Sequence, residues 1–339
     1  MRFVHNRFRE SGPFPAPPTA AREFHRTLPG YAPTPLIDCR PLADSLGLRS
    51  LLVKDESYRF GLNAFKALGA SFAMHRIARP GTIFSAATAG NHGRAVAWSA
   101  RLLGCSAKIF VPSITTSARV ANIRKEGAEV EVVNGSYEDA VRLCDARSRA
   151  HGWQVISDTG YEGYLEIPKW VVEGYQTLFL EFEEQCDQPP DVVFIQAGVG
   201  GLLCAAVDHF RSRTSSPRII AVEPESADGL LESISSPAGE PCVSKGAQDS
   251  IMAGLNCCEV SLTAWPTIRR GVDAFLAIED SLALQAMDLL RGAGIDSGES
   301  GAAGLAGLLA LRKEFQGHRV MLVNTEGHCT SNFSRASQV

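Results

Sequence analysis

The sequence predicts an α/β fold with mostly parallel sheets flanked by helices. Short stretches rich in β-branched residues alternate with longer helical stretches, and several of the helical stretches end at glycine. Parallel strands that are buried on both faces should be continuous apolar runs, and VVFI at 192–195 is such a run.

The first predicted strand, SLLVKDE at 50–56, is an apolar run with a polar end, and a helix is expected at 63–78. TIFSAAT at 82–88 is the next strand, followed by a helix at 91–104 that ends at glycine. The strand–helix alternation continues with strands at 106–112, 128–134 and 153–157 and helices at 116–127 and 136–152.

The same alternation resumes at residue 191. DVVFIQAG at 191–198 predicts a strand, GLLCAAVDHFRSR at 201–213 a helix, and RIIAVEPE at 218–225 a strand. HRVMLVNTE at 318–326 is the last clear strand. Strands joined by helical crossovers in this way are typical of parallel sheets.

The composition is that of an ordinary globular protein. In 339 residues, 45% are apolar and 21% are charged, enough for one large or two modest domains. The net charge of −4 and the lack of a basic stripe argue against a nucleic-acid partner. No apolar run is long enough to cross a membrane, and the N-terminus lacks the apolar segment of a secretory signal, so we expect a cytoplasmic protein without a membrane partner.

The nine cysteines are scattered without the CxxC spacing of a metal site. We therefore expect no metal and, in a cytoplasmic enzyme, reduced thiols. Cys144 and Cys204 have apolar neighbours and are predicted core residues. His328 and Cys329 are adjacent donors, but two neighbouring residues do not make a metal site.

A glycine-rich turn follows one predicted strand. Gly198, Val199, Gly200 and Gly201 precede a helix, where bare backbone N–H groups and the helix dipole favour an anion such as phosphate. The spacing is not that of the dinucleotide fingerprint. A tight turn with no ligand is the alternative interpretation.

Three further polar residues lie at predicted strand–helix junctions. Asn91 begins a helix and either caps it or directs its amide at a bound ring, while His92 beside it suits a structural hydrogen bond. Asp158 ends a strand and either contacts a ligand or satisfies turn amides. Thr325 ends the last strand with a hydroxyl.

Lys66 lies in NAFKALGAS, an aromatic and small-residue context that is unusual for a charge. Most helix lysines are solvated and have no role. Together with a phosphate-binding turn, an asparagine and a hydroxyl, however, this amine meets the needs of an aldehyde cofactor with a phosphate group. Desolvation would lower the pKa of the amine and allow it to form a Schiff base.

Several long motifs in order strengthen this hypothesis. They are YAPTPL (31–36), VKDESYRFGLNAFKALGAS (53–71), GNHGRAVAW (90–98), DTGYEGYLEIPKW (158–170), QAGVGGL (196–202), VEPESAD (222–228), IMAGLNC (251–257), SGESGAAGL (297–305) and NTEG (324–327). Through them the chain resembles the fold-type II pyridoxal-phosphate enzymes, which include threonine dehydratase and tryptophan synthase β. Within that family it is most similar to the diaminopropionate ammonia-lyases.

The resemblance implies two domains, a small one at 79–158 inserted in a large cofactor-binding one formed by 1–78 and 159–339, with pyridoxal phosphate in the cleft between them. It also implies a homodimer. Lys66 would be the Schiff-base lysine and Lys54 structural. The cofactor-binding residues would further comprise Asn91, Gly198, Val199, Gly200, Gly201, Leu202 and Thr325.

The implied reaction is an α,β-elimination of a β-substituted amino acid to a 2-keto acid and ammonia, with Asp158 as the base that acts on an L-substrate. A neutral hydroxyl at Thr325 would leave the pyridine nitrogen unprotonated, which favours elimination over transamination. A β-replacement enzyme, a serine or threonine dehydratase and a non-catalytic pyridoxal-phosphate-binding protein are the alternatives.

Two departures from the family pattern affect the substrate. Ala89 stands where the family has an aspartate that serves the D-isomer, so the L-isomer is expected to be favoured. The segment Gly327-His328-Cys329-Thr330 replaces an acidic segment of the family. The sequence therefore does not determine which β-substituent of the substrate the enzyme recognises.

Overall fold

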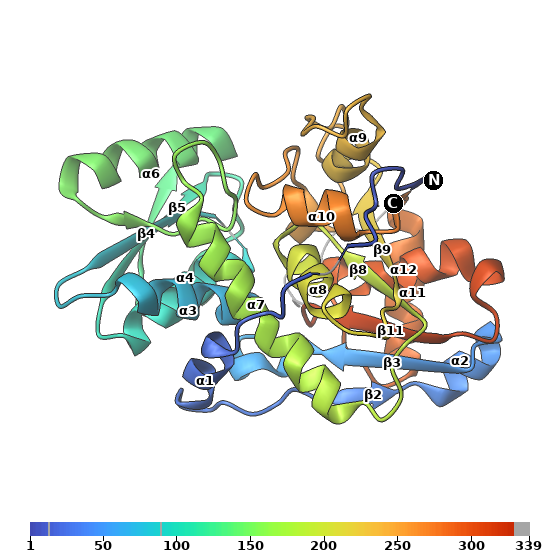
Figure 1. Ribbon diagram of the computed structural model, residues 1–339. Helices are drawn as coiled ribbons and strands as arrows, with labels where there is room; N and C mark the ends of the chain where they lie inside the picture. The colour runs from blue at the N-terminus through green and yellow to red at the C-terminus, as the bar shows by residue number, and fades with distance from the viewer. Residues whose placement is uncertain (13, 89, 329–339) are drawn as a thin grey trace, which may run out of the picture. The chain divides into compact units, whose positions relative to one another are not determined.

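A computed structural model describes residues 1–12, 14–88 and 90–328, and Ala89 and Cys329 therefore lie outside the described residues. The chain forms two compact units (Figure 1). The large unit comprises Met1–Phe65 and Thr159–His328, and the small unit comprises Lys66–Asp158.

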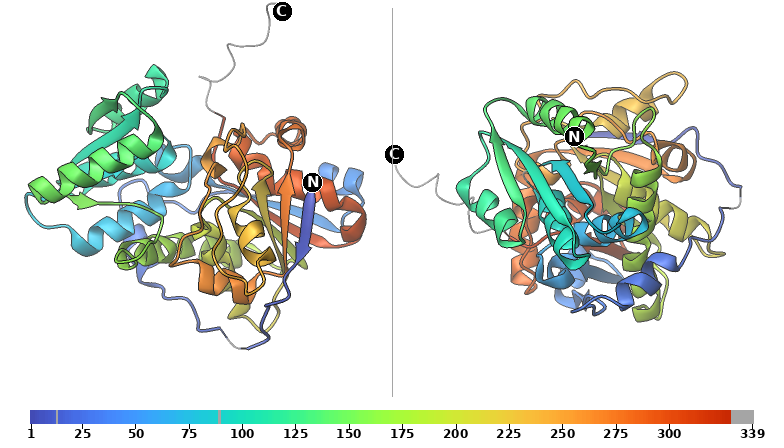
Figure 2. Two further views of the ribbon diagram at one scale, coloured as in Figure 1. Left: turned by 90° about the horizontal axis from the view of Figure 1, so that it is seen from above. Right: turned by 90° about the vertical axis from the view of Figure 1, so that its left-hand side faces the viewer.

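A seven-stranded sheet with the order β1-β10-β9-β8-β11-β3-β2 forms the centre of the large unit. The five inner strands run parallel, and the two edge strands β1 and β2 are antiparallel to their neighbours. Figure 2 shows β1 in blue beside β10 in orange. The strands are β1 (Arg2–His5), β2 (Leu36–Asp38), β3 (Ser50–Asp55), β8 (Val192–Gln196), β9 (Arg218–Pro224), β10 (Ala274–Ile278) and β11 (Arg319–Asn324).

Helices cover this sheet, and β8 and β10 are buried along their whole length, as expected of strands that are covered on both faces. The helices are α1 (Ala20–Arg26), α2 (Arg40–Leu46), α7 (Glu166–Gln185), α8 (Gly201–Arg211), α9 (Gly229–Ser235), α10 (Trp265–Gly271), α11 (Asp280–Gly292) and α12 (Glu299–Leu311), with 3₁₀ turns η1 (Glu56–Gly61), η2 (Ala253–Leu255) and η3 (Arg312–Phe315). One core cluster joins alternate strand residues such as Phe194 and Val222 with α2, α11 and α12. Glycines let α12 approach closely, because a Cβ on Gly307 would lie 2.6 Å from a Val222 methyl.

The small unit is a four-stranded parallel sheet with the order β6-β5-β4-β7. Its strands are β4 (Ile83–Ala87), β5 (Ser106–Pro112), β6 (Glu129–Val133) and β7 (Gln154–Val155), and its helices are α3 (Lys66–Ile77), α4 (Asn91–Leu102), α5 (Ser117–Lys125) and α6 (Tyr137–His151). In Figure 1, α6 lies on one side of this sheet, and α3 and α4 lie on the other. A capping box of Ser136 and Asp139 begins α6, and left-handed Gly152 ends it.

Helix α3 begins at Lys66, three residues later than the sequence predicted. Asn63 has a left-handed backbone with φ of 61°, and the Phe65 N–H donates to the Thr325 carbonyl at 3.2 Å. Both features are incompatible with a helix over 63–65. Residues 66–77 group with the small unit because α3 packs against α4.

Among the described residues, no helix is long and apolar enough to cross a membrane. The eight described cysteines are thiols, and Cys144 and Cys204 are buried as predicted.

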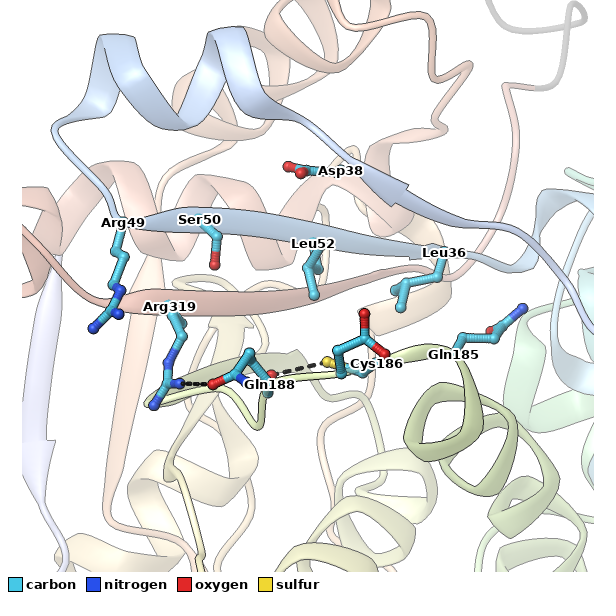
Figure 3. Close-up of a pocket in the computed structure, with 10 residues that line it drawn as sticks. Leu36, Asp38, Arg49, Ser50, Leu52, Gln185, Cys186, Gln188 and Arg319 are labelled. Carbon is cyan, nitrogen blue, oxygen red and sulfur yellow. Dashed lines mark hydrogen bonds between the residues drawn. The ribbon is translucent and has the colours of Figure 1, made fainter.

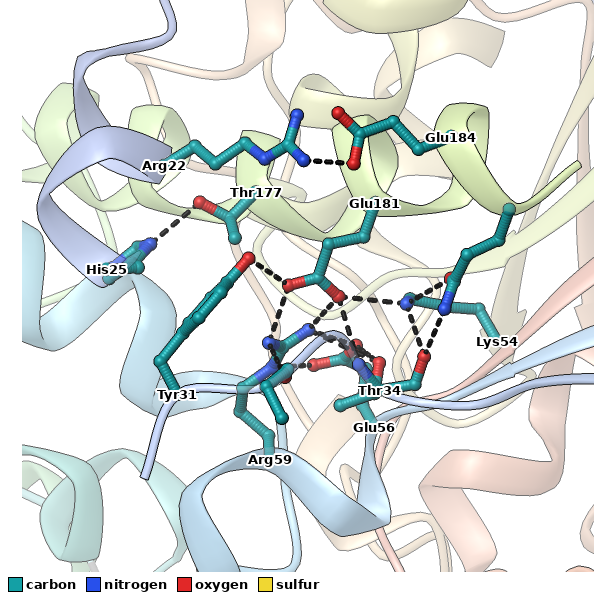
Figure 4. Close-up of polar contacts among 12 residues, drawn as sticks. Arg22, His25, Tyr31, Thr34, Lys54, Glu56, Arg59, Thr177, Glu181 and Glu184 are labelled. Carbon is teal, nitrogen blue, oxygen red and sulfur yellow. Dashed lines mark hydrogen bonds and ion pairs between the residues drawn. The ribbon is translucent and has the colours of Figure 1, made fainter. Parts of the chain in front are cut away.

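A fully buried cluster of charges lies beneath η1 in the large unit (Figure 4). We call it the buried ion cluster: Lys54, Glu56, Arg59 and Glu181. Glu181 accepts from Lys54 Nζ at 2.8 Å and from both terminal nitrogens of Arg59 at 2.8 Å, and Arg59 also pairs with Glu56. Lys54 is thus buried and paired with Glu181, which agrees with the structural role that the resemblance implied for it.

Candidate active site

Lys66 and Asp158 form an ion pair in the small unit, at the two ends of its sequence. Lys66 is the first residue of α3, and Asp158 follows β7. The Lys66 Nζ lies 2.5 Å from Asp158 Oδ2, and about a fifth of each side chain is exposed, 22% and 20%. An amine and a carboxylate in direct contact can exchange a proton, so the pair suits acid–base chemistry.

Burial and the neighbouring positive charge act in opposite directions on the pKa of Asp158. Burial alone would raise the pKa of this carboxyl, but the positive charge of Lys66 and its hydrogen bond hold the pKa well below the ordinary value. Asp158 is therefore a carboxylate at neutral pH while Lys66 is charged.

His92 lies near this pair and is buried. Its Nε2 is 2.9 Å from the Ile156 carbonyl, to which it donates, and burial lowers the pKa of the imidazole. The imidazole of His92 is therefore neutral and carries its proton on Nε2. Its hydrogen bond to Ile156 is of the structural kind that the sequence predicted for His92.

Asn91 is the first residue of α4 and is half-buried. The N-cap position of this helix is held by Gly90. The capping interpretation of Asn91 is therefore wrong, because the residue lies inside the helix and not at its cap.

The glycine turn connects β8 to α8 in the large unit. Gly200 is the N-cap of α8 with φ of +98°, a conformation that residues with a Cβ rarely adopt. A Cβ on Gly198 would lie 3.0 Å from Cys257 Sγ, and one on Gly200 would lie 2.6 Å from an Ile268 methyl. The turn thus needs bare backbone, and it exposes N–H groups at the start of an 11-residue helix. Val199 lies in the turn, and Leu202 in the first turn of α8.

Thr325 follows β11 and is 4% exposed. Its Oγ1 accepts a hydrogen bond from Gln196 Nε2 at 3.2 Å. Next to it, Glu326 pairs with Ala64, and the Gly327 N–H donates to the Asn63 carbonyl at 3.0 Å. Backbone bonds therefore tie the segment after β11 to residues 63–65, immediately before Lys66 in the chain.

Sequence reasoning did not single out Gln196, whose side-chain amide contacts Thr325. It ends β8, whose other four residues are apolar. A single amide at the carboxyl end of an otherwise apolar buried strand is the signal that would have found it, because ligands of parallel sheets collect at that end.

A cavity of about 440 Å³ in the large unit lies away from these residues (Figure 3). Its lining includes Ser50 and Arg319, the first residues of β3 and β11. It therefore lies at the amino ends of these parallel strands, whereas Gln196 is the last residue of β8, and Gly198 and Thr325 follow the carboxyl ends of β8 and β11.

A model of the family described as pyridoxal-phosphate dependent enzyme matches residues 27–326. The chain belongs to this family. Like its other members, this pyridoxal-phosphate-dependent enzyme uses pyridoxal phosphate as its cofactor.

The relatives of this pyridoxal-phosphate-dependent enzyme include the diaminopropionate ammonia-lyase of Salmonella typhimurium, to which it is 37% identical over 90% of this chain and 87% of the relative. Its structure matches that of holo diaminopropionate ammonia lyase from Escherichia coli with a TM-score of 0.89 and 34% identity, over 96% of this chain and 93% of that chain. A structure of the E. coli enzyme with an aminoacrylate–PLP azomethine reaction intermediate matches over the same shares, with a TM-score of 0.88. The predicted fold type II is thereby confirmed.

The residues of this pyridoxal-phosphate-dependent enzyme fit its cofactor chemically. Lys66 supplies a partly exposed amine, the turn at 198–201 supplies a cradle that side chains would fill, and Thr325 supplies a neutral hydroxyl. These groups match an aldehyde, a phosphate and a ring nitrogen respectively. Among the described residues, no group of three or more potential ligands could hold a metal ion.

Proposed function

We propose that this enzyme is an ammonia-lyase that eliminates ammonia from 2,3-diaminopropionate or a close analogue to give pyruvate. The observation that carries the proposal is the Lys66–Asp158 pair, an amine and a carboxylate 2.5 Å apart. It is supported by 37% identity to diaminopropionate ammonia-lyase over 90% of the chain.

The cofactor would be held by the residues that the family resemblance implies. Lys66 would bind its aldehyde carbon covalently, and Asn91 would donate to its phenolic oxygen. The turn at Gly198, Val199, Gly200 and Gly201, with Leu202 after it, would bind the phosphate, and Thr325 would face the ring nitrogen. When bound, pyridoxal phosphate withdraws electrons from Cα of an attached amino acid and so acidifies the Cα–H.

Asp158 would accept the α-proton of an L-substrate at a carboxylate oxygen. The ammonium of Lys66 keeps this carboxyl ionised in the structure. Once the Lys66 amine is engaged elsewhere that charge no longer acts on Asp158, and burial then raises its pKa toward the range of a useful base.

The L-isomer is the proposed substrate stereoisomer. Ala89, where the family has the aspartate that serves the D-isomer, carries no proton-accepting group. Turnover of D-diaminopropionate should therefore be at least about a hundredfold slower than that of the L-isomer, which is the effect of a missing general base. Ammonia and pyruvate release from each isomer measures the ratio, and equal rates would contradict the assignment.

A labelling experiment tests the covalent attachment. The protein is reconstituted with pyridoxal phosphate, reduced with borohydride and digested, and the peptides are mapped by mass spectrometry. The label is expected on Lys66, with Lys54 as an internal control because its amine is fully buried in the buried ion cluster. A label on another lysine, or none in cofactor-saturated protein, would refute the proposal.

A cytoplasmic homodimer is the proposed biological form. The homodimer rests on the family resemblance, and the cytoplasmic location rests on the lack of a membrane-length apolar run in the sequence. Sedimentation equilibrium of the cofactor-loaded protein tests it, with a mass twice that of the 36.4 kDa chain as the expected result.

A further inference from the structure

Gln196 makes an unusually dense set of contacts through one atom. Its Nε2 lies 2.9 Å from the Val323 carbonyl, 3.0 Å from that of Gly301 and 3.1 Å from that of Ser300. The fourth neighbour is Thr325 Oγ1, at 3.2 Å. Gln196 is only 2% exposed, so water does not compete for these contacts.

The three carbonyls determine which end of the amide points at Thr325. A carbonyl oxygen accepts hydrogen bonds and cannot donate, so three of them around one position require the NH₂ end there. If the amide were reversed, its oxygen Oε1 would face these three carbonyl oxygens, and no hydrogen would lie between them. Oε1 of Gln196 has no hydrogen-bond partner among the described residues.

This orientation determines what Thr325 can do. The amide NH₂ shares its two hydrogens among four acceptors and cannot itself accept, so the contact uses a lone pair of Thr325 Oγ1 and leaves its hydroxyl hydrogen available. A hydroxyl whose lone pair is occupied by a fixed donor turns its own hydrogen toward another acceptor. An unprotonated pyridine nitrogen is such an acceptor.

We propose that Gln196 is a positioning residue that makes Thr325 a hydrogen-bond donor to the pyridine nitrogen of the cofactor. The inference rests on the proposed placement of Thr325 at that nitrogen. A neutral hydroxyl that donates to the ring nitrogen leaves this nitrogen unprotonated. An unprotonated ring withdraws electrons from the substrate less strongly, and this favours elimination over transamination. Without Gln196, Thr325 can rotate and the nitrogen loses its fixed partner.

The test is a double-mutant cycle read by NMR. Gln196→Met removes the donor at similar length, Thr325→Val removes the hydroxyl, and both are combined. Each protein is loaded with pyridoxal phosphate labelled with ¹⁵N in the ring, and the ¹⁵N chemical shift is measured without substrate. Gln196→Met is expected to move the shift toward that of a pyridine nitrogen without a hydrogen bond, Thr325→Val to move it at least as far, and the double variant no further than Thr325→Val.

Gln176→Met is the matched control. Gln176 is also 2% exposed, donates through Nε2 to the Ala205 carbonyl at 3.1 Å, and has an Oε1 without a partner among the described residues. Gln176→Met should leave the ¹⁵N chemical shift of the bound cofactor unchanged. In Gln196→Met we also expect kcat to fall about tenfold, the effect of one lost neutral hydrogen bond, with KM little changed.

Each outcome is decisive. A wild-type ¹⁵N shift in loaded Gln196→Met, or an undiminished Gln196→Met effect in the Thr325→Val background, overturns the inference. Gln196→Asn, which keeps an amide one methylene too short, replaces Gln196→Met should the latter not fold. Wild-type protein that binds no labelled cofactor would instead refute the proposed function.

Discussion

Two side chains in contact, Lys66 and Asp158, carry opposite charges in a partly buried setting. Each stabilises the ionised form of the other, and the pKa of Asp158 lies well below the ordinary value. The same contact explains why a lysine follows an aromatic residue here: its charge has a partner. The pair therefore affects both stability and reactivity.

Asp158→Asn should abolish most of the activity on an L-substrate. The amide keeps the shape of the side chain but cannot accept the α-proton, so kcat should fall about 10²- to 10⁴-fold. Ammonia release at saturating substrate measures it. Asp145→Asn is the control, since Asp145 pairs with Arg149 at 3.0 Å in the same unit. Retained activity in Asp158→Asn would rule out its role as the base.

Lys66→Met should change how the stability of the cofactor-free protein depends on pH. Because the pKa of Asp158 is lowered by Lys66, the pair stabilises the folded state above the ordinary carboxyl pKa, and this stability is lost as the pH falls below it. The variant lacks that contribution, so its difference from wild type should be largest at pH 6–7 and shrink toward pH 3, and its size should be about 1–3 kcal/mol.

Urea unfolding at several pH values measures this difference. Lys245→Met serves as the control, because the Lys245 side chain is 87% exposed. A difference between Lys66→Met and wild type that stays constant from pH 7 to pH 3 would contradict the linkage.

At the scale of an element, the turn between β8 and α8 needs glycine at position 200 for two reasons, the conformation of the backbone and the lack of space for a side chain. Gly200 has a left-handed φ, and its missing side chain leaves room for Ile268. Either requirement alone would favour glycine. Together they hold the N-terminus of α8 bare, as anion binding needs.

Gly200→Ala should weaken both stability and cofactor retention. The left-handed conformation costs an L-residue about 1–2 kcal/mol, and the contact with Ile268 adds about 1 kcal/mol. Gly294→Ala is the control, since Gly294 has φ of +80° with nothing within 4 Å of the added Cβ. Fluorescence titration with pyridoxal phosphate should show weaker binding in Gly200→Ala alone. Equal binding in both variants would show that the turn does not hold the phosphate.

At the scale of the whole molecule, the buried ion cluster joins parts of the large unit that are far apart in sequence. Glu181 of α7 binds Lys54 of β3 and Arg59 of η1, more than 120 residues away. Tyr31 and Thr34 add hydrogen bonds to Glu181 from the N-terminal segment. Burial alone would raise the pKa of Glu181, but Arg59 and Lys54 lower it to about 2.

Arg59→Met should destabilise the protein by about 3–5 kcal/mol, because it leaves two buried carboxylates without their main partner. Urea unfolding at pH 7 measures the loss. Arg142→Met, which removes an exposed ion pair with Asp139, should change the stability far less. The lowered pKa of Glu181 also predicts that wild-type stability falls as the pH drops from about 4.5 toward 2, and that Arg59→Met reduces this dependence.

Local sequence patterns predicted much of the parallel core. The runs at 106–112 and 218–225 are strands within one residue of their expected ends, because most of their residues are apolar and buried, as in a parallel sheet that is covered on both faces. The edge strand β1 was not predicted, because RFVH becomes a strand only through pairing with β10. The long helix α7 was missed as well.

The residue types that suit pyridoxal phosphate, their order along the chain and the burial of the core strands were determined by the sequence alone. An amine, a bare turn and a hydroxyl at strand ends are local features, which a chain displays without its partners. The pairing of Lys66 with Asp158, the donor role of Gln196 and the burial of Arg59 against Glu181 were decided only by the tertiary structure. Each of these depends on atoms 90 residues or more apart in sequence, whose meeting no local pattern encodes.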